Sequence, residues 1–109
     1  PYLIRYSDIA LTYAEAAGPT DKAYQLVNYI RSRSGLGDLQ PNLSLEQFRE
    51  AVLNERKFEL AFEGKICYDL RRWNRLHTDI ESAKNQGLTA DVMVFYPLPS
   101  IETDLNPNL

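Results

Sequence analysis

Two acidic residues occupy positions of a predicted helix that should be apolar. At about 100° per residue, Glu55 and Glu59 fall within a helical arc whose other members are hydrophobic. Burying an ionised carboxylate without a partner costs several kcal/mol, so such residues persist only when they are paired and hydrogen-bonded. Two arginines that follow Gly64, Arg71 and Arg72, are the predicted partners, because a guanidinium group can hold a carboxylate through two parallel bonds. The apolar members of the arc are Phe48, Ala51, Val52, Phe58 and Phe62.

These pairs predict a structural ion-pair network that ties the long helix to the segment at 69–73. An alternative interpretation takes Glu55, Glu59 and Glu63 as acid/base groups, since glycoside hydrolysis uses two carboxylates. No nucleophile and base, phosphate-binding glycine loop or nucleotide fingerprint accompanies them in the sequence, so no catalytic residue is expected. The members of the predicted network are Glu55, Arg56, Glu59, Glu63, Asp69, Arg71, Arg72 and Trp73.

Composition limits the ligands that such a chain can bind. With 12 basic and 15 acidic residues and a formal charge of −3, the sequence lacks the basic stripe that is typical of nucleic-acid-binding proteins. One histidine and one cysteine exclude most zinc sites, so neither a metal nor another cofactor is expected. The cysteine, Cys67, is predicted to pack in apolar surroundings. Tyr68 and Trp73 could stack on sugar rings, but packing is favoured, and no glycan-binding residue is identified.

The beginning of the chain predicts a helical hairpin. Hydrophobic residues recur at helical spacing over residues 5–17, and the face that they form, which includes two tyrosines, is predicted to be buried. Alanines on this face would allow a neighbouring helix to approach closely. Gly18-Pro19-Thr20 provides a stop, a turn and a cap before a second helix at 21–34, which Gly35 ends. The pair resembles a tetratricopeptide unit, although no period repeats further along the chain.

A long central helix is predicted after a loop at 35–42. Ser44 and Gln47 have the spacing of a capping box, and the helix is expected to run over residues 44–62 until Gly64 terminates it. Hydrophobic residues lie on several sides of this helix, so much of its circumference should be buried.

The remaining residues predict little regular structure beyond one helix at 69–76. The polar stretch at 77–91 is predicted to form a surface loop. The apolar run at 92–96 is followed by prolines, which favours an extended segment laid on the helices. The predicted fold class is therefore all-α, with a tetratricopeptide-like hairpin, a long central helix and an irregular or extended C-terminal segment.

Several sequence motifs, taken in their order along the chain, resemble those of a known protein family. They are Arg5-Tyr6-Ser7-Asp8, Tyr13-Ala14-Glu15-Ala16, Asn28-Tyr29-Ile30-Arg31-Ser32-Arg33-Ser34-Gly35, Asn54-Glu55-Arg56-Lys57-Phe58-Glu59-Leu60-Ala61-Phe62-Glu63-Gly64, Asp69-Leu70-Arg71-Arg72-Trp73, Tyr96-Pro97-Leu98-Pro99 and Asn106-Pro107-Asn108. Each motif is weak alone. In this order, over nearly the whole chain, they resemble the C-terminal part of the SusD/RagB family, surface glycan-binding lipoproteins of Bacteroidetes.

This resemblance implies a non-enzymatic role in nutrient uptake. A protein of this kind captures oligosaccharides at the cell surface, on the outer membrane, and closes like a lid over a SusC-like TonB-dependent transporter. Residues 1–109 would then be the C-terminal region of a longer protein, a single domain or a fragment, and would serve mainly as helical scaffold. The oligosaccharide would be bound by the full-length parent. The membrane would be reached only through a lipid anchor outside this chain, since no apolar run approaches the roughly 18 residues that a spanning helix needs.

Two departures from the family pattern are visible. Ile66-Cys67-Tyr68 stands where the family usually has a polar or aromatic pair, and the lipidated N-terminal cysteine is absent. The second departure fits a chain that lacks its N-terminal portion, as does a sequence that opens on Pro1. The alternative function is a tetratricopeptide-like module that binds another protein through its hairpin.

Overall fold

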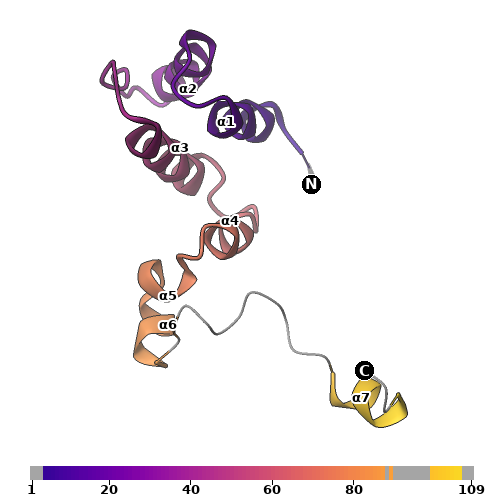
Figure 1. Cartoon of the computed structure of the whole chain (residues 1–109). Helices are drawn as coiled ribbons and strands as arrows, with labels where there is room; N and C mark the ends of the chain where they lie inside the picture. The colour runs from indigo at the N-terminus through magenta and orange to yellow at the C-terminus, as the bar shows by residue number, and fades with distance from the viewer. Residues whose placement is uncertain (1–3, 88, 90–98, 107–109) are drawn as a thin grey trace. The chain divides into compact units, whose positions relative to one another are not determined.

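The computed structural model describes residues 4–87, 89 and 99–106 (Figure 1). The chain is divided into two compact units, Pro1–Ile66 and Cys67–Leu109. Every regular element among the described residues is a helix, which confirms the predicted all-α class. The extended segment predicted at 92–96 lies outside the described residues.

The first unit is built from the helices α1 (Tyr6–Ala17), α2 (Asp21–Arg33) and α3 (Leu45–Glu59), each of which contacts the other two. The predicted break between α1 and α2 is confirmed. Gly18 has a φ of +72°, which a side chain would make unfavourable, and the hydroxyl of Thr20 accepts the N–H of Ala23 at 3.3 Å. The two helices therefore form the expected hairpin.

The end of α2 and the start of α3 also agree with the sequence predictions. Gly35 has a φ of +72° and donates its N–H to the carbonyl of Ser32, while Leu36 donates to the carbonyl of Arg31, both at 3.0 Å. This pair of bonds is the Schellman motif, which ends a helix and satisfies its last carbonyls. Ser44 and Gln47 then form the predicted capping box at the start of α3.

The core of the first unit lies where the three helices meet. The predicted alanine face is confirmed for Ala10 and Ala14, which are buried and let the neighbouring helices approach α1 closely. The ring of Phe48 packs against that of Tyr24 at a centroid distance of 4.9 Å, which joins α3 to α2. The buried members of this cluster are Ala10, Leu11, Ala14, Ala23, Val27, Ile30, Phe48 and Val52.

Several aromatic residues predicted to be buried are exposed. On α1, Tyr6 is 61% exposed and Tyr13 47%, because the buried side of the helix is turned toward Ser7 and Leu11. On α3, Phe58 is 80% exposed, because charged residues take the buried positions in the last turns of that helix. Phe62 is also fully exposed and lies beyond the end of α3, with a φ of +64°. The hydrophobic arc predicted for this helix was therefore wrong at its C-terminal end.

The second unit contains short helices: α4 (Ile66–Arg72), α5 (Leu76–Asp79), α6 (Glu81–Asn85) and α7 (Ser100–Leu105). The helix predicted at 69–76 begins earlier and ends earlier. Asn74 ends the helix because its backbone is in the left-handed region, at a φ of +53°. The N–H of Asn74 donates to the carbonyl of Arg71, and the N–H of Arg75 donates to the carbonyl of Leu70.

Residues predicted to form a surface loop at 77–91 are partly helical. Helices α5 and α6 contact each other, and the methyl group of Ala83 is buried in this unit. None of the helices in the described part of the chain has the length and apolar character needed to cross a bilayer.

Candidate functional site

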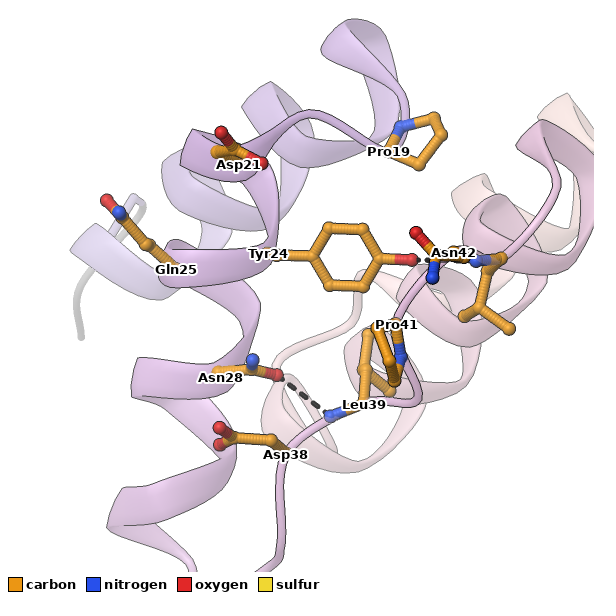
Figure 2. Close-up of a pocket in the computed structure, with 10 residues that line it drawn as sticks. Pro19, Asp21, Tyr24, Gln25, Asn28, Asp38, Leu39, Pro41 and Asn42 are labelled. Atoms are coloured by element: carbon orange, nitrogen blue, oxygen red, sulfur yellow. Dashed lines mark hydrogen bonds between the residues drawn. The ribbon is translucent and has the colours of Figure 1, made fainter.

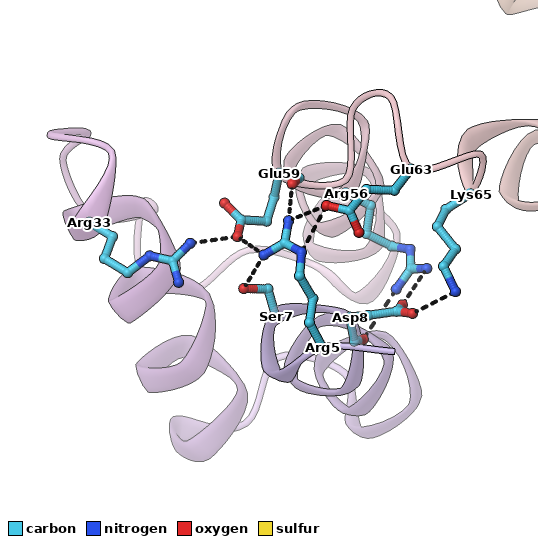
Figure 3. A network of polar contacts seen from close by, with 8 residues as sticks. All are labelled: Arg5, Ser7, Asp8, Arg33, Arg56, Glu59, Glu63 and Lys65. Atoms are coloured by element: carbon cyan, nitrogen blue, oxygen red, sulfur yellow. Dashed lines mark hydrogen bonds and ion pairs between the residues drawn. The ribbon is translucent and has the colours of Figure 1, made fainter. Parts of the chain in front are cut away.

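Glu59 is the centre of a polar network at one end of the first unit (Figure 3). One of its carboxylate oxygens, Oε1, accepts a hydrogen bond from Arg5 and another from Arg33, each at 2.6 Å. The side chain is only 8% exposed. The antiparallel hairpin brings these arginines together, because it places the beginning of α1 beside the end of α2.

Arg5 joins the start of α1 to the end of α3 (Figure 3). Its Nε donates to Oε1 of Glu63 at 2.8 Å, and its terminal nitrogens donate to the hydroxyl of Ser7 and to the main-chain carbonyl of Glu59. The last of these bonds satisfies a carbonyl at the C-terminus of α3, where a cation is also favoured by the helix dipole. The hydrogen bonds to Glu63 and Glu59 raise the pKa of Arg5.

Two further ion pairs connect α3 to its neighbours. Arg31 of α2 pairs with Glu55 at 2.9 Å. Arg56 is itself buried and pairs with Asp8 of α1 at 3.0 Å, while its other terminal nitrogen donates to the hydroxyl of Thr12 at 3.1 Å. The last two turns of α3 therefore carry charged groups that hold α1 and α2.

The carboxylates predicted to need partners have them, but the observed partners differ from the predicted ones. Glu59 pairs with Arg5, which precedes the hairpin, and with Arg33, which ends it. Glu55 pairs with Arg31 in the last turn of α2. Sequence reasoning did not identify Arg31 and Arg33 as partners of these carboxylates. It also did not include Asp8, which is buried, in the predicted network. The signal that could have identified them is the antiparallel hairpin itself, which collects these charges at one end.

The other predicted network residues lie in the second unit. Asp69 is buried in α4 and pairs with Arg72 at 2.9 Å, and the guanidinium group of Arg72 lies 5.9 Å from the ring centroid of Trp73. Arg71 belongs to the last turn of the same helix. The clamp predicted between these residues and Glu55 or Glu59 joins two units and stays a prediction. Glu55 and Glu59, the buried carboxylates for which it was predicted, already have arginine partners within the first unit.

The network lowers the pKa values of two of its carboxylates, Glu59 and Asp8. Burial by itself raises the pKa of Glu59, but hydrogen bonds from Arg5, Ser7 and Arg33 outweigh it and hold the pKa below its ordinary value of 4.5. Asp8 behaves likewise, since bonds from Lys65 and Arg56 outweigh its burial. A general acid needs a raised pKa near the working pH, so these groups are poorly suited to acid catalysis.

These lowered pKa values predict a loss of stability in acid. A carboxylate whose pKa is lower in the folded state contributes stability above its unfolded pKa and loses it as the pH falls through the folded value. The free energy of unfolding should therefore be nearly constant from pH 7 to about 5 and should fall below about 4.5, the ordinary pKa of Glu59. Urea denaturation at stepped pH measures this. Glu59→Gln should flatten the acid slope, and an unchanged slope in that variant would contradict the assignment.

A second feature of the first unit is an open groove of about 820 Å³ between α2 and the loop that precedes α3 (Figure 2). The Tyr24 ring extends from α2 toward this loop, and its hydroxyl accepts the N–H of Leu43 at 3.0 Å. The side-chain oxygen of Asn28 accepts the N–H of Leu39 at 2.9 Å. These bonds fasten the loop to α2. Sequence reasoning predicted only a loop here.

The groove has a volume typical of small-molecule sites, which range from about 300 to 1,000 Å³. Its walls carry acidic and amide side chains beside prolines, leucines and the tyrosine ring. It contains no group of three or more potential metal ligands, and none occurs elsewhere among the described residues. This groove, rather than the ion-pair network, has room for a ligand.

Comparison with known proteins identifies the family. The sequence matches the SusD family over residues 1–93. Three proteins of Formosa agariphila are similar to it. SusD-like protein P2 is 31% identical over 123 residues, which cover 97% of this chain and 24% of that protein. SusD-like protein P25 is 32% identical over 119 residues, covering 98% and 22%. SusD-like protein P38 is 33% identical over 107 residues, covering 88% and 21%.

The chain thus spans about a quarter of the length of the curated relatives that it matches. No solved structure shows a significant match. The helical architecture, the order of the sequence motifs and the match over residues 1–93 lead to the same conclusion: the chain belongs to the SusD family.

Proposed function

We propose that this chain acts in the glycan-binding component of an outer-membrane nutrient uptake system. The observation that carries the proposal is the family match over residues 1–93. The protein would bind oligosaccharides at the cell surface and pass them to a SusC-like TonB-dependent transporter. In that assembly the first unit would serve mainly as helical scaffold, because its core and its ion-pair network fix the helices in place.

A role without catalysis is part of this proposal. The carboxylates that could act as a glycosidase pair are occupied by arginines, since Glu59 accepts bonds from two and Glu55 from one. The lowered pKa of Glu59 also disfavours the protonated form that a general acid must supply. The protein should therefore bind glycans and leave them intact.

Glycan binding can be measured directly by isothermal titration calorimetry. We expect at least one neutral oligosaccharide to bind with a dissociation constant below about 1 mM, equivalent to roughly 4 kcal/mol of binding free energy. Chromatography of the ligand after prolonged incubation should show no shortened product. Oligosaccharide cleavage that disappears in Glu59→Gln would contradict the non-enzymatic role. Capture of a SusC-like transporter from outer membranes would test the partner.

The alternative function, a protein-binding module, is favoured by one observation. Tyr6, Ile9 and Tyr13 recur along one exposed face of α1, where a partner helix could pack. A module of this kind would bind a protein and would give no heat with any oligosaccharide. The same titration therefore separates the two functions.

A further inference from the structure

The groove beside α2 has a shape that is fixed by the protein itself. Tyr24 and Asn28 each accept a main-chain N–H from the opposite wall, at 3.0 and 2.9 Å. The Tyr24 ring is also packed against the buried ring of Phe48. A site whose walls are already held in place loses little conformational entropy when a ligand binds. The groove is thus preorganised.

Most polar side chains that line the groove make no contacts that stabilise the fold. Asp21 and Gln25 on α2 and Asp38 and Asn42 on the loop are all exposed and line the groove. Within the described residues, these side chains make neither hydrogen bonds nor ion pairs. Asn28 differs, because its oxygen is occupied by Leu39 while its amide hydrogens remain as donors. Acidic and amide side chains therefore line the groove on both α2 and the loop.

The charge of the groove selects among ligands. Asp21 and Asp38 give it two negative charges, and its described lining contains no lysine, arginine or histidine. Phosphate, sulfate and uronate groups would be repelled. The prolines, the leucines and the tyrosine ring supply apolar surface beside the polar groups (Figure 2). Because the proposed function is glycan binding, the ligand that fits this lining is a sugar without anionic groups, whose hydroxyls can bond the polar side chains and whose C–H faces can contact the apolar surface.

We propose that this groove is a binding subsite for a neutral oligosaccharide. Carboxylates and amides would bond the sugar hydroxyls, and the apolar surfaces of Tyr24 and its neighbours would contact the C–H face of a sugar ring. The inference rests on the proposed function and deepens it, because it places glycan contacts within this chain.

The test uses side chains that can be changed without disturbing the fold. Gln25→Ala and Asp38→Ala remove exposed groups that line the groove, whereas Gln40→Ala removes an exposed amide of the same loop that does not line it. Thermal melting should show all three variants to be as stable as the unaltered chain. Hexasaccharides of glucose, mannose, galactose and xylose are titrated by calorimetry, together with an oligogalacturonate of the same length.

We expect Gln25→Ala and Asp38→Ala each to weaken the binding of the preferred neutral hexasaccharide about tenfold, the effect of losing one or two hydrogen bonds. Gln40→Ala should bind normally. In amide spectra of the isotope-labelled chain, the same ligand should shift the signals of Leu39 and Leu43. The oligogalacturonate should bind at least tenfold more weakly than the neutral ligand.

The possible results separate this inference from the proposed function. Normal binding by both groove variants would overturn the subsite while leaving glycan binding in place. Equal or tighter binding of the oligogalacturonate would overturn the choice of a neutral ligand. Absence of binding of every hexasaccharide to this chain would overturn the subsite.

Discussion

Replacing Glu59 by alanine is expected to lower the free energy of unfolding by about 3 kcal/mol, the low end of the cost of breaking a buried ion pair. The loss is large because Arg5 and Arg33 both bond the same carboxylate oxygen and would lose that partner. The low end applies because Arg5 keeps Glu63 as a second partner and is partly exposed. Urea denaturation followed by far-ultraviolet circular dichroism measures the change.

Glu46→Ala is the matched control in the same helix. Glu46 is exposed and lies in the first turn of α3, where a negative charge contributes only a few tenths of a kcal/mol through the helix dipole. Its replacement should change stability by less than about 0.5 kcal/mol. If the two variants unfold at the same urea concentration, Glu59 does not hold the helices together. Any glycan affinity should be nearly intact in the folded fraction of both.

Replacing Phe48 by alanine is expected to cost about 4 kcal/mol, within the range for large-to-small changes in a core. Phe48 is fully buried, and its ring packs on that of Tyr24. The change would therefore leave a cavity between α2 and α3 in addition to removing apolar contacts. Since domains of this size have a total stability of about 5–15 kcal/mol, the urea midpoint should fall markedly.

Phe58→Ala, in the same helix, tests the position of the buried arc. Phe58 is largely exposed, so its loss should cost less than about 0.5 kcal/mol. The sequence pattern alone places the two phenylalanines on one buried arc and predicts similar costs for both. A loss above about 2 kcal/mol for Phe58→Ala would show that the arc continues to the end of α3, as the pattern indicates.

The helix ends could be predicted because they depend on local chemistry. The glycine at 18, the threonine at 20 and the capping box at 44–47 act within one turn of the chain, so neighbouring residues determine them. Gly35 ended α2 for the same reason. Asn74 ended α4 with the same left-handed geometry, but asparagine adopts it less often than glycine, and the predicted helix ran too far.

The partners of the charged groups could not be predicted, because they depend on how whole helices pack. A helical wheel shows that Glu55 and Glu59 face an apolar arc, and it does not show which helix covers that arc. Arg31 and Arg33 reach them only because three helix ends meet. The groove was equally inaccessible to pattern analysis. It exists because main-chain N–H groups of a loop bond side chains of α2, and no repeat or spacing records such contacts.

The network at Arg5 also bears on the order in which the first unit folds. Arg5 is separated from Glu59 by 54 residues and from Glu63 by 58, whereas α1 and α2 are neighbours along the chain. Closing a long loop costs more entropy than forming a local hairpin, so these bonds should be made late. Interactions that are absent from the transition state act mainly on the rate of unfolding. The charged cluster should therefore lengthen the lifetime of the folded state without speeding its formation.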